Sequence, residues 1–107
     1  MAGLAEKSCI PCRGGIPALT ATEIRPLRAE VKGWKVIGNH HLEREFGFPD
    51  FKNALSFVNK VGRIAEKEGH HPDIYLAWGK ARVTIWTHKV DGLTESDFIL
   101  AAKIDRV

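Results

Sequence analysis

The sequence predicts an α+β domain of two layers, in which a four-stranded antiparallel sheet carries helices on one face. Three segments repeat apolar residues at helical spacing, and two pairs of short alternating segments are each joined by a turn. Their order along the chain is α-β-β-α-β-β-α. Because hairpins separated by helices form an antiparallel sheet with the helices laid across it, this order indicates the architecture.

The first helix is expected to begin at Thr20, which makes a capping-box pattern with Glu23. Apolar residues then recur at helical spacing as far as Gly33, a residue type that commonly ends helices. Pro26 falls inside this segment, where it removes a backbone donor and clashes with the preceding turn. We therefore expect a short or kinked helix.

The first hairpin follows directly. Trp34–Gly38 reads as a short strand, Asn39-His40 supply the turn, and His41–Phe48 return as the second strand. The alternation of the second strand is imperfect around Arg44, but a hairpin is still the natural interpretation.

The longest helix has Asp50 as its expected N-cap and Gly69 as its C-terminal cap. Its apolar residues form two neighbouring lines, Phe51, Leu55, Val58, Gly62 and Ala65 on one and Ala54, Phe57, Val61 and Ile64 on the other. This stripe is wider than one contact with a sheet needs, so the helix is expected to pack against a partner helix as well. The sequence thus predicts a homodimer or homotetramer formed through the 50–67 helix.

The second hairpin is expected to run from Asp73–Trp78 through a turn at Gly79-Lys80 to Ala81–His88. The last helix has Thr94 as its N-cap, with Asp97 three residues later in capping-box spacing.

Residues 1–19 lack periodicity and are rich in turn formers, so we expect a flexible N-terminal arm before a single domain at 20–107. Cys9 and Cys12 form a Cys-x-x-Cys pair in this arm. A structural zinc site wants about four ligands, and a thioredoxin-like motif should lie near a βαβ pattern. Neither context is present, which leaves a loose arm or, less favoured, half of an intersubunit metal site.

Composition limits the classes of function. Apolar residues make up 44% and charged residues 27% of the chain, as in ordinary globular domains. The net charge of +3 is spread thinly without a Lys/Arg run and argues only weakly for nucleic acid, so no nucleic-acid partner is expected. No apolar run approaches the ~20 residues that span a bilayer, so no membrane partner is expected. The first residues are too polar for a signal peptide, and a cytoplasmic location is expected.

Five protonatable side chains fall close together in the second half of the sequence: Glu66, His70, His71, His88 and Asp97. Imidazole has an unperturbed pKa near neutrality, so a histidine cluster suits proton transfer. The second hairpin turns about midway between His71 and His88, so pairing about that turn should bring them together. Glu66 lies one helical turn before His70, on the same face.

Each of these residues also has a plainer interpretation. A His-His-Pro sequence is often only a surface loop, and Glu66 would serve as a solvated helix carboxylate. Asp97 can close the capping box of the last helix by itself. Trp78 and Trp86 are most simply core or sheet-face aromatics, although one of them could line a pocket for a flat ring.

The pattern does not favour a metal. Adjacent histidines do not share a helix face, and His-x-x-x-His spacing is absent, although a zinc site remains conceivable with three histidines and carboxylates. The sequence also contains no covalent-nucleophile motif and no glycine-rich phosphate loop. The favoured hypothesis is an acid–base site without metal.

The spacing Glu66-x3-His70-His71-Pro72-x5-Trp78-x9-His88-x8-Asp97 resembles the signature of the pterin-4a-carbinolamine dehydratases. The resemblance extends from about Thr20 to the C-terminus. It includes the pair Gly33-Trp34 and the helix entry Gly92-Leu93-Thr94-Glu95. The family fold has the same α-β-β-α-β-β-α order.

The resemblance implies the dehydration of 4a-hydroxytetrahydrobiopterin to quinonoid dihydropterin and water, in tetrahydrobiopterin recycling. The substrate is the by-product of aromatic amino acid hydroxylases, which would be pathway partners. A hydroxyl leaves C4a while N5 loses a proton, so no electrons are exchanged with a cofactor. No cofactor and no metal are therefore expected.

The resemblance also implies roles for individual residues. His70, His71 and His88 would carry the catalysis, with His70 and His88 as the acid–base pair and His71 holding the ring. The substrate-binding or orienting residues would be Glu66, Pro72, Ile74, Trp78 and Asp97, of which the two carboxylates favour charged imidazoles. The chain departs from the family at Ile74, where an aromatic residue is frequent, and at Gly69, where some members are acidic.

A function of another class stays open. Animal members of the family also act as dimerisation partners of a homeodomain transcription factor, through the surface of the long helix. The resemblance thus implies, as the alternative, a non-catalytic interaction module that uses the apolar face of residues 51–65.

Overall fold

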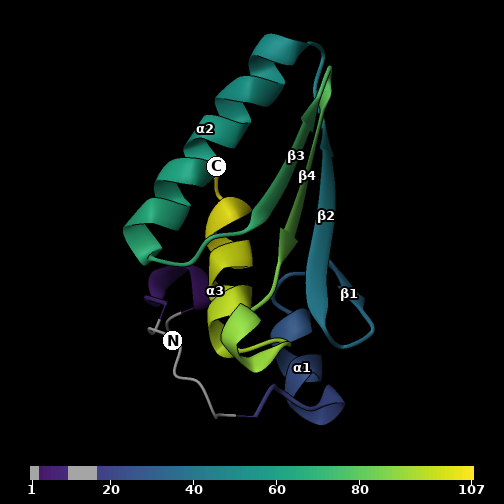
Figure 1. Ribbon diagram of the computed structural model, residues 1–107, viewed down its shortest axis with the longest axis vertical. Helices are drawn as coiled ribbons and strands as arrows, with labels where there is room; N and C mark the ends of the chain where they lie inside the picture. The colour runs from purple at the N-terminus through teal and green to yellow at the C-terminus, as the bar shows by residue number, and fades with distance from the viewer. Residues whose placement is uncertain (1–2, 10–16) are drawn as a thin grey trace.

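The computed structural model describes residues 3–9 and 17–107 and has the expected α+β architecture. Figure 1 shows α2 and α3 together on one side of the sheet. The main elements are α1 (Ala21–Arg28), β1 (Lys35–Ile37), β2 (His41–Gly47), α2 (Phe51–Glu68), β3 (Asp73–Ala77), β4 (Lys80–Ile85) and α3 (Glu95–Ile104). Two short 3-10 turns, η1 (Leu4–Glu6) and η2 (His88–Val90), complete the described elements. The predicted order α-β-β-α-β-β-α is confirmed.

The sheet has the strand order β1-β2-β4-β3, and all neighbours are antiparallel. In this register Leu42 pairs with Ile85 and Ile74 pairs with Val83. Leu42, Val83 and Ile85 are fully buried, because this face of the sheet packs against the helices. The start of β3 and the end of β4 lie side by side at one edge, where α2 also ends.

Both hairpin turns lie one residue earlier than predicted. In the first, Gly38 and Asn39 have positive φ angles of 58° and 56°, and the His40 N–H donates to the Ile37 carbonyl. In the second, Trp78 and Gly79 form the turn, with Gly79 at φ 69°. Glycine and asparagine tolerate the left-handed region, so their positions decide where each turn falls. Strand β4 also ends at Ile85, before the predicted end at His88.

Helix α2 is capped as predicted. Asp50 accepts a hydrogen bond from the Asn53 N–H at 2.8 Å, and Gly69 ends the helix in the left-handed conformation, with φ 65°. The apolar line of Ala54, Phe57 and Val61 is buried against the core, and so is Ala65 at the end of the other line. The other line begins with Phe51 and Leu55, which are 43% and 40% exposed. Gly69 thus sets the direction in which the chain leaves toward β3.

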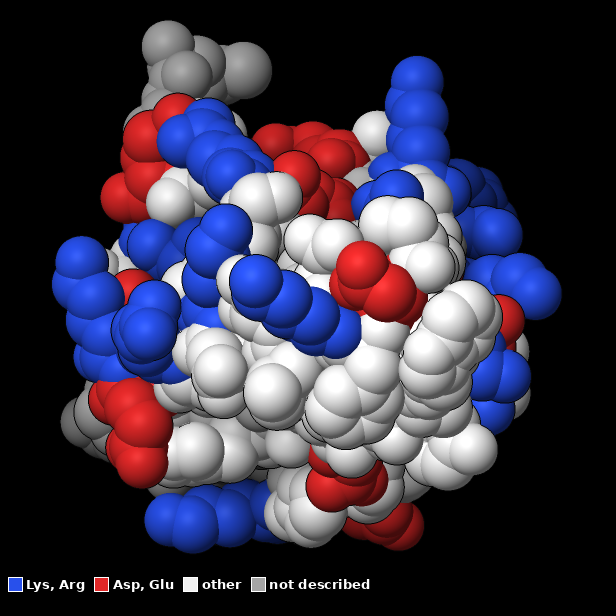
Figure 2. Space-filling model, turned by 90° about the horizontal axis from the view of Figure 1, so that it is seen from above, with Lys and Arg blue, Asp and Glu red and all other residues white. Residues whose placement is uncertain are grey.

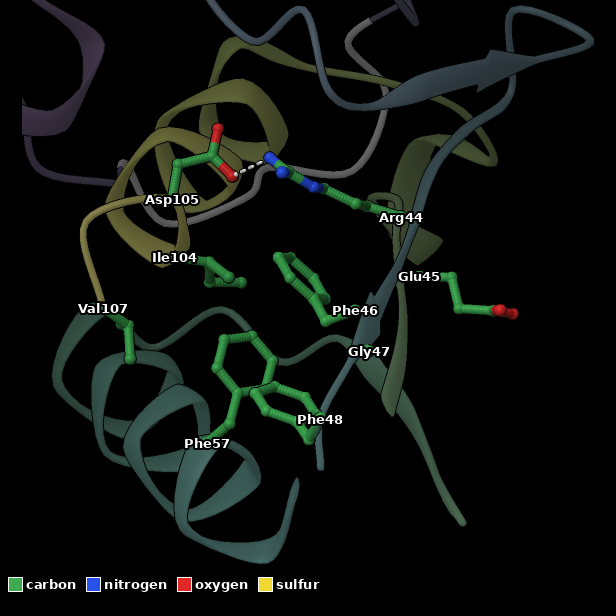
Figure 3. Close-up of a pocket in the computed structure, with 9 residues that line it drawn as sticks. All are labelled: Arg44, Glu45, Phe46, Gly47, Phe48, Phe57, Ile104, Asp105 and Val107. Carbon is green, nitrogen blue, oxygen red and sulfur yellow. Dashed lines mark hydrogen bonds and ion pairs between the residues drawn. The ribbon is translucent and has the colours of Figure 1, made fainter. Parts of the chain in front are cut away.

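Arg44 breaks the strand pattern because its charge is paired on the core side of the sheet. Its guanidinium donates to Asp105 Oδ1 at 2.8 Å, and the Trp34 indole donates to the same oxygen at 2.8 Å. A Cβ added to Gly33 would lie 2.4 Å from Arg44 Nη1, so the Gly33-Trp34 sequence leaves room for this pair. Figure 3 shows Arg44 reaching Asp105 above the ring of Phe46.

Below this ion pair, a hollow of about 380 Å³ lies between β2, α2 and the end of α3. Figure 3 shows Phe46, Phe48 and Phe57 gathered on one side of it. The Phe57 ring centre lies 4.5 Å from that of Phe46 and 5.2 Å from that of Phe48. These aromatic contacts hold the middle of α2 against the sheet.

Part of the predicted arm is packed against the domain. Leu4, in η1, is 3% exposed and belongs to the core cluster, and Lys103 of α3 donates to the Ala5 carbonyl at 3.0 Å. Cys12 lies outside the described residues. The division of the chain at residue 19 into arm and domain stays a prediction. In the described part of the chain, no helix is long and apolar enough to cross a membrane.

Candidate active site

A hollow of about 530 Å³ opens where α2 ends, β3 begins and the chain leaves β4, at the lower end of α2 in Figure 1. Its lining consists of Gly69, His70, His71, Pro72, Asp73, Trp86, Thr87, His88 and Lys89. Because β3 and β4 are antiparallel, residues before β3 and after β4 meet at this edge. His88 therefore shares one cavity wall with His70 and His71, although it is distant from them in sequence.

His70 follows the helix cap directly and is held by a buried carboxylate. Its Nε2 lies 2.6 Å from Oδ1 of Asp97. The His70 side chain is 14% exposed, whereas that of Asp97 is fully buried. An ionised carboxylate only accepts hydrogen bonds, so Nε2 carries the proton and Nδ1 is the acceptor nitrogen of the neutral ring. Asp97 would stabilise the imidazolium that forms when Nδ1 takes up a proton.

The second oxygen of Asp97 is also occupied. Oδ2 accepts from the Thr94 N–H at 2.8 Å and from the Thr87 hydroxyl at 2.9 Å. The first of these bonds belongs to the capping box that begins α3. Asp97 therefore acts both as part of the helix cap and as the partner of an imidazole, the two interpretations that the sequence offered. The helix start fixes the carboxylate that orients His70.

His71 points to a different partner. Its Nε2 lies 3.2 Å from Oε2 of Glu66, and the two side chains are 61% and 80% exposed. An exposed pair of this kind contributes less than about 1 kcal/mol to stability. Glu66 does not line the hollow, so its contact with the site runs through His71.

His88 stands at the start of η2 and stacks on Trp86. The two ring centres are 4.2 Å apart and the ring planes differ by 5°. Thr87, between them, points the other way and is buried, with its hydroxyl on Asp97. The alternation of strand β4 therefore continues past its end, with His88 and Trp86 at the hollow and Thr87 beneath it.

Comparison with known proteins identifies the family of the chain. The family model described as Pterin 4 alpha carbinolamine dehydratase matches residues 17–107. The chain belongs to this family. A relative from Rubrobacter xylanophilus, provisionally named pterin-4-alpha-carbinolamine dehydratase, is 54% identical over the whole of both chains. One from Alkaliphilus metalliredigens with the same provisional name is 57% identical, covering 99% of this chain and 96% of the relative. The resemblance seen in the sequence is confirmed, and the protein is a dehydratase enzyme.

Solved structures support the dehydratase fold. A transcriptional coactivator/pterin dehydratase from Brucella melitensis superposes with a TM-score of 0.78 at 33% identity, over 83% of this chain and 96% of the other. A pterin dehydratase-like protein described as a RuBisCO assembly factor has a TM-score of 0.60 at 21% identity, over 69% of this chain and 87% of the other. The second likeness shows the fold alone.

The remaining predicted site residues, Pro72, Ile74 and Trp78, lie in three different environments. Pro72 lines the hollow beside His71. Ile74 is partly buried and packs against the core. Trp78 lies in the β3–β4 turn, at the other end of the hairpin, and is 73% exposed. Among the described residues, the tryptophan that borders the hollow is thus Trp86. Trp78, which the family resemblance suggested as a binding residue, does not border it.

Three residues at or beside the site are absent from the sequence predictions. Thr87 holds Asp97, and His40 and His41 lie against Trp86, with ring centres 5.5 Å and 6.0 Å away. The signal for Thr87 was its place between Trp86 and His88 in an alternating strand. His40 and His41 gave no local signal, because only the pairing of β2 with β4 brings them to Trp86.

Cys9 lies next to the site without lining it. Its backbone N–H donates to Glu68 Oε1 at 2.9 Å, and its thiol approaches the Ser96 carbonyl at 3.5 Å. Burial, and after it the Glu68 carboxylate, raises the pKa of the Cys9 thiol to about 12. The hydrogen bond from Cys9 in turn lowers the pKa of Glu68. A protonated thiol of this kind is a structural group, since thiolates are the nucleophiles. Within residues 3–9 and 17–107, no three His, Cys, Asp or Glu side chains are grouped as metal ligands.

Proposed function

We propose that the protein dehydrates 4a-hydroxytetrahydrobiopterin to quinonoid dihydropterin by acid–base catalysis with imidazoles and without a metal. The observation that carries this proposal is the His70–Asp97 pair at 2.6 Å in the wall of a hollow that His88 also borders. A volume of about 530 Å³ lies within the ~300–1,000 Å³ range of small-molecule sites.

The reaction needs one proton donated and one removed. The C4a–O bond breaks and the hydroxyl leaves as water with a proton from the acid. The base removes the N5 proton, and the electron pair of that N–H bond forms the N5–C4a double bond. Each positioned group of this kind contributes on the order of 10²–10⁴ in rate.

We assign the two proton transfers to His70 and His88. The neutral His70 ring offers Nδ1 as the base, and Asp97 favours the charged ring that results. His71 holds the pterin ring, with Glu66 orienting it at 3.2 Å. Pro72 closes the wall beside it.

The pathway and location are proposals as well. The product fits tetrahydrobiopterin recycling behind an aromatic amino acid hydroxylase, in the cytoplasm. Both stay predictions from the sequence.

A stopped-flow assay on the purified protein tests the reaction. The decay of 4a-hydroxytetrahydrobiopterin should be faster with the protein than without it, and equally fast after treatment with a chelator. A protein that leaves the decay rate unchanged would overturn the assignment. Loss of activity with chelator, restored by zinc, would overturn the metal-free mechanism.

A second candidate function rests on the exposed line of α2. Phe51 and Leu55 are exposed on this helix, and Trp78 is exposed in the β3–β4 turn. Figure 2, which views the end of the molecule where α2 begins, shows uncharged side chains over much of the centre of that face. We propose that this surface forms the homodimer or homotetramer. The alternative is that it binds a transcription regulator, as the coactivator name of the Brucella melitensis structure suggests.

A further inference from the structure

A second cluster of polar and aromatic side chains lies outside the hollow, behind Trp86. His40 Nε2 is 2.7 Å from Oδ1 of Asp91. His40 belongs to the β1–β2 turn and Asp91 follows η2, so this contact joins two loops that are far apart in sequence. Asp91 has φ 49° and ψ 50°, a left-handed conformation that costs roughly 1–2 kcal/mol outside glycine. The turn that carries His88 is therefore held in a specific shape.

Proton positions in this cluster follow from the acceptor at its end. The Asp91 carboxylate accepts only, so the neutral His40 ring carries its proton on Nε2. The Nδ1 atom of His40 then accepts from Nδ1 of His41, 3.1 Å away. His40, His41 and Asp91, whose side chain is 90% exposed, thus form a directed chain of hydrogen bonds that orients both rings.

Trp86 connects this chain to the active site. The ring centres of His40 and His41 lie 5.5 Å and 6.0 Å from that of Trp86. His88 stacks on Trp86 with nearly parallel planes. The Trp86 ring therefore touches the outer histidines as well as the imidazole at the hollow.

Hydrogen bonds fix the backbone beside His88, but they do not fix the orientation of its ring. Thr87 forms a bridge with Gly92, in which the Thr87 N–H donates to the Gly92 carbonyl at 2.8 Å. The His88 side chain is exposed, so burial does not set its rotamer. Among the described residues, the contact that fixes the plane of this ring is the stack on Trp86.

We propose that His40 is a positioning residue for the dehydration. Through its bond to Asp91 it holds the Trp86 ring and the η2 turn together, and the stack then keeps the His88 imidazole facing the hollow. This inference rests on the proposed function only in taking His88 as one of the proton-transfer groups.

The kinetics of single and double variants test whether His40 and Asp91 position His88. In His40→Ala, kcat should fall roughly tenfold, with KM changed less than about twofold, because small misplacements of a reacting group cost this much or more. His40→Gln keeps a donor for Asp91 and an acceptor for His41, and should recover most of kcat. Asp91→Ala should match His40→Ala, and the double variant should be no slower than either. Lys35→Ala, an exposed change in the same hairpin, serves as the control.

Proton NMR of the imidazoles gives a readout that is independent of activity. Stacking on Trp86 should shift the His88 ring protons upfield in the wild type, and the shift should shrink in His40→Ala and Asp91→Ala but not in Lys35→Ala. Unchanged kcat and unchanged His88 shifts in a folded His40→Ala variant would overturn the proposal, as would additive losses in the double variant. An inactive wild type with the expected shifts would overturn the proposed function and leave the positioning intact.

Discussion

Asp97 accepts hydrogen bonds from the start of a helix, from a threonine and from an imidazole at the same time. Its two oxygens face three donors on different elements: the Thr94 N–H, the Thr87 hydroxyl and His70 Nε2. A fully buried carboxylate is tolerated because all of these donors face it. The placement of the histidine therefore depends on the same bonds that begin α3.

An Asp97→Asn variant tests this dual role. The amide has an NH2 group in place of one carboxylate oxygen. At least one of the three donors then faces another donor and lacks an acceptor. Leaving such a group unsatisfied costs about 1–3 kcal/mol, and we expect that loss in urea unfolding together with a marked loss of dehydration rate. Glu95→Gln on the same helix is the control, because the Glu95 pair with Lys7 is exposed and contributes less than about 1 kcal/mol. Equal stability of the two variants would contradict the role of Asp97.

Cys9 should be unreactive at ordinary pH. In a Cys12→Ser background, alkylation by iodoacetamide should stay slow at pH 8 and rise only near the Cys9 pKa of about 12. Because this pKa is raised, the thiol favours the folded state below the ordinary thiol pKa, and that contribution is lost as pH rises toward 12. Glu68→Gln should lower the Cys9 pKa without restoring its usual value, since burial is the larger cause. An alkylation profile with the ordinary midpoint would show that Cys9 is not buried.

Single residues also show where sequence reasoning stopped. His70, His71 and His88 could be grouped from local signals: a helix cap, a proline and a hairpin. Asp97 was assigned an orienting role beside them by the family resemblance. His40 could not be grouped with them, because its contact with Asp91 depends on which strands neighbour each other. The sequence predicts hairpins but not the order β1-β2-β4-β3.

The helix starts and the end of α2 were predicted best, because caps are local, whereas α1 ends at Arg28 and not at the predicted Gly33. Thr20, Asp50, Gly69 and Thr94 all cap as expected. The turns were each displaced by one residue, because strand periodicity alone does not say which residue takes a positive φ. Gly79 settles the second turn and places Trp78 outside the strand.

Two glycines of α2 give a matched test at this scale. Gly69 is left-handed at the C-cap, so Gly69→Ala should destabilise the protein by about 1 kcal/mol. Gly62 is inside the helix, and Gly62→Ala should stabilise it by about 0.5–1 kcal/mol. In the single chain an added Cβ has no neighbour within 4 Å at either position, so backbone conformation decides the sign there. Urea unfolding of both variants measures it, and a destabilised Gly62→Ala would contradict the account.

The fold class and the order of the elements were predicted from the sequence, but the orientation of α2 on the sheet was not. The two apolar lines of α2 do not by themselves say which one faces the sheet, and packing selected the line with Phe57 and Val61. Polar substitutions there would disrupt folding and not only assembly.

Assembly is therefore tested on the exposed line. Phe51→Ser with Leu55→Ser should reduce the mass measured by sedimentation, because these side chains are about two-fifths exposed in the single chain. Urea unfolding of the resulting species should show a folded protein, and Lys60→Ser on the same helix should leave the mass unchanged. A double variant that keeps the wild-type mass would place the subunit contact elsewhere.

The dehydration rate of His70→Ala, measured by stopped flow at saturating pterin and compared with the wild type, is the most direct test of the acid–base site. The account predicts a fall of about 10²–10⁴ in kcat, since a proton-transfer group is lost, while the fold survives because Thr94 and Thr87 still donate to Asp97. A folded His70→Ala protein that turns over at the wild-type rate would contradict it.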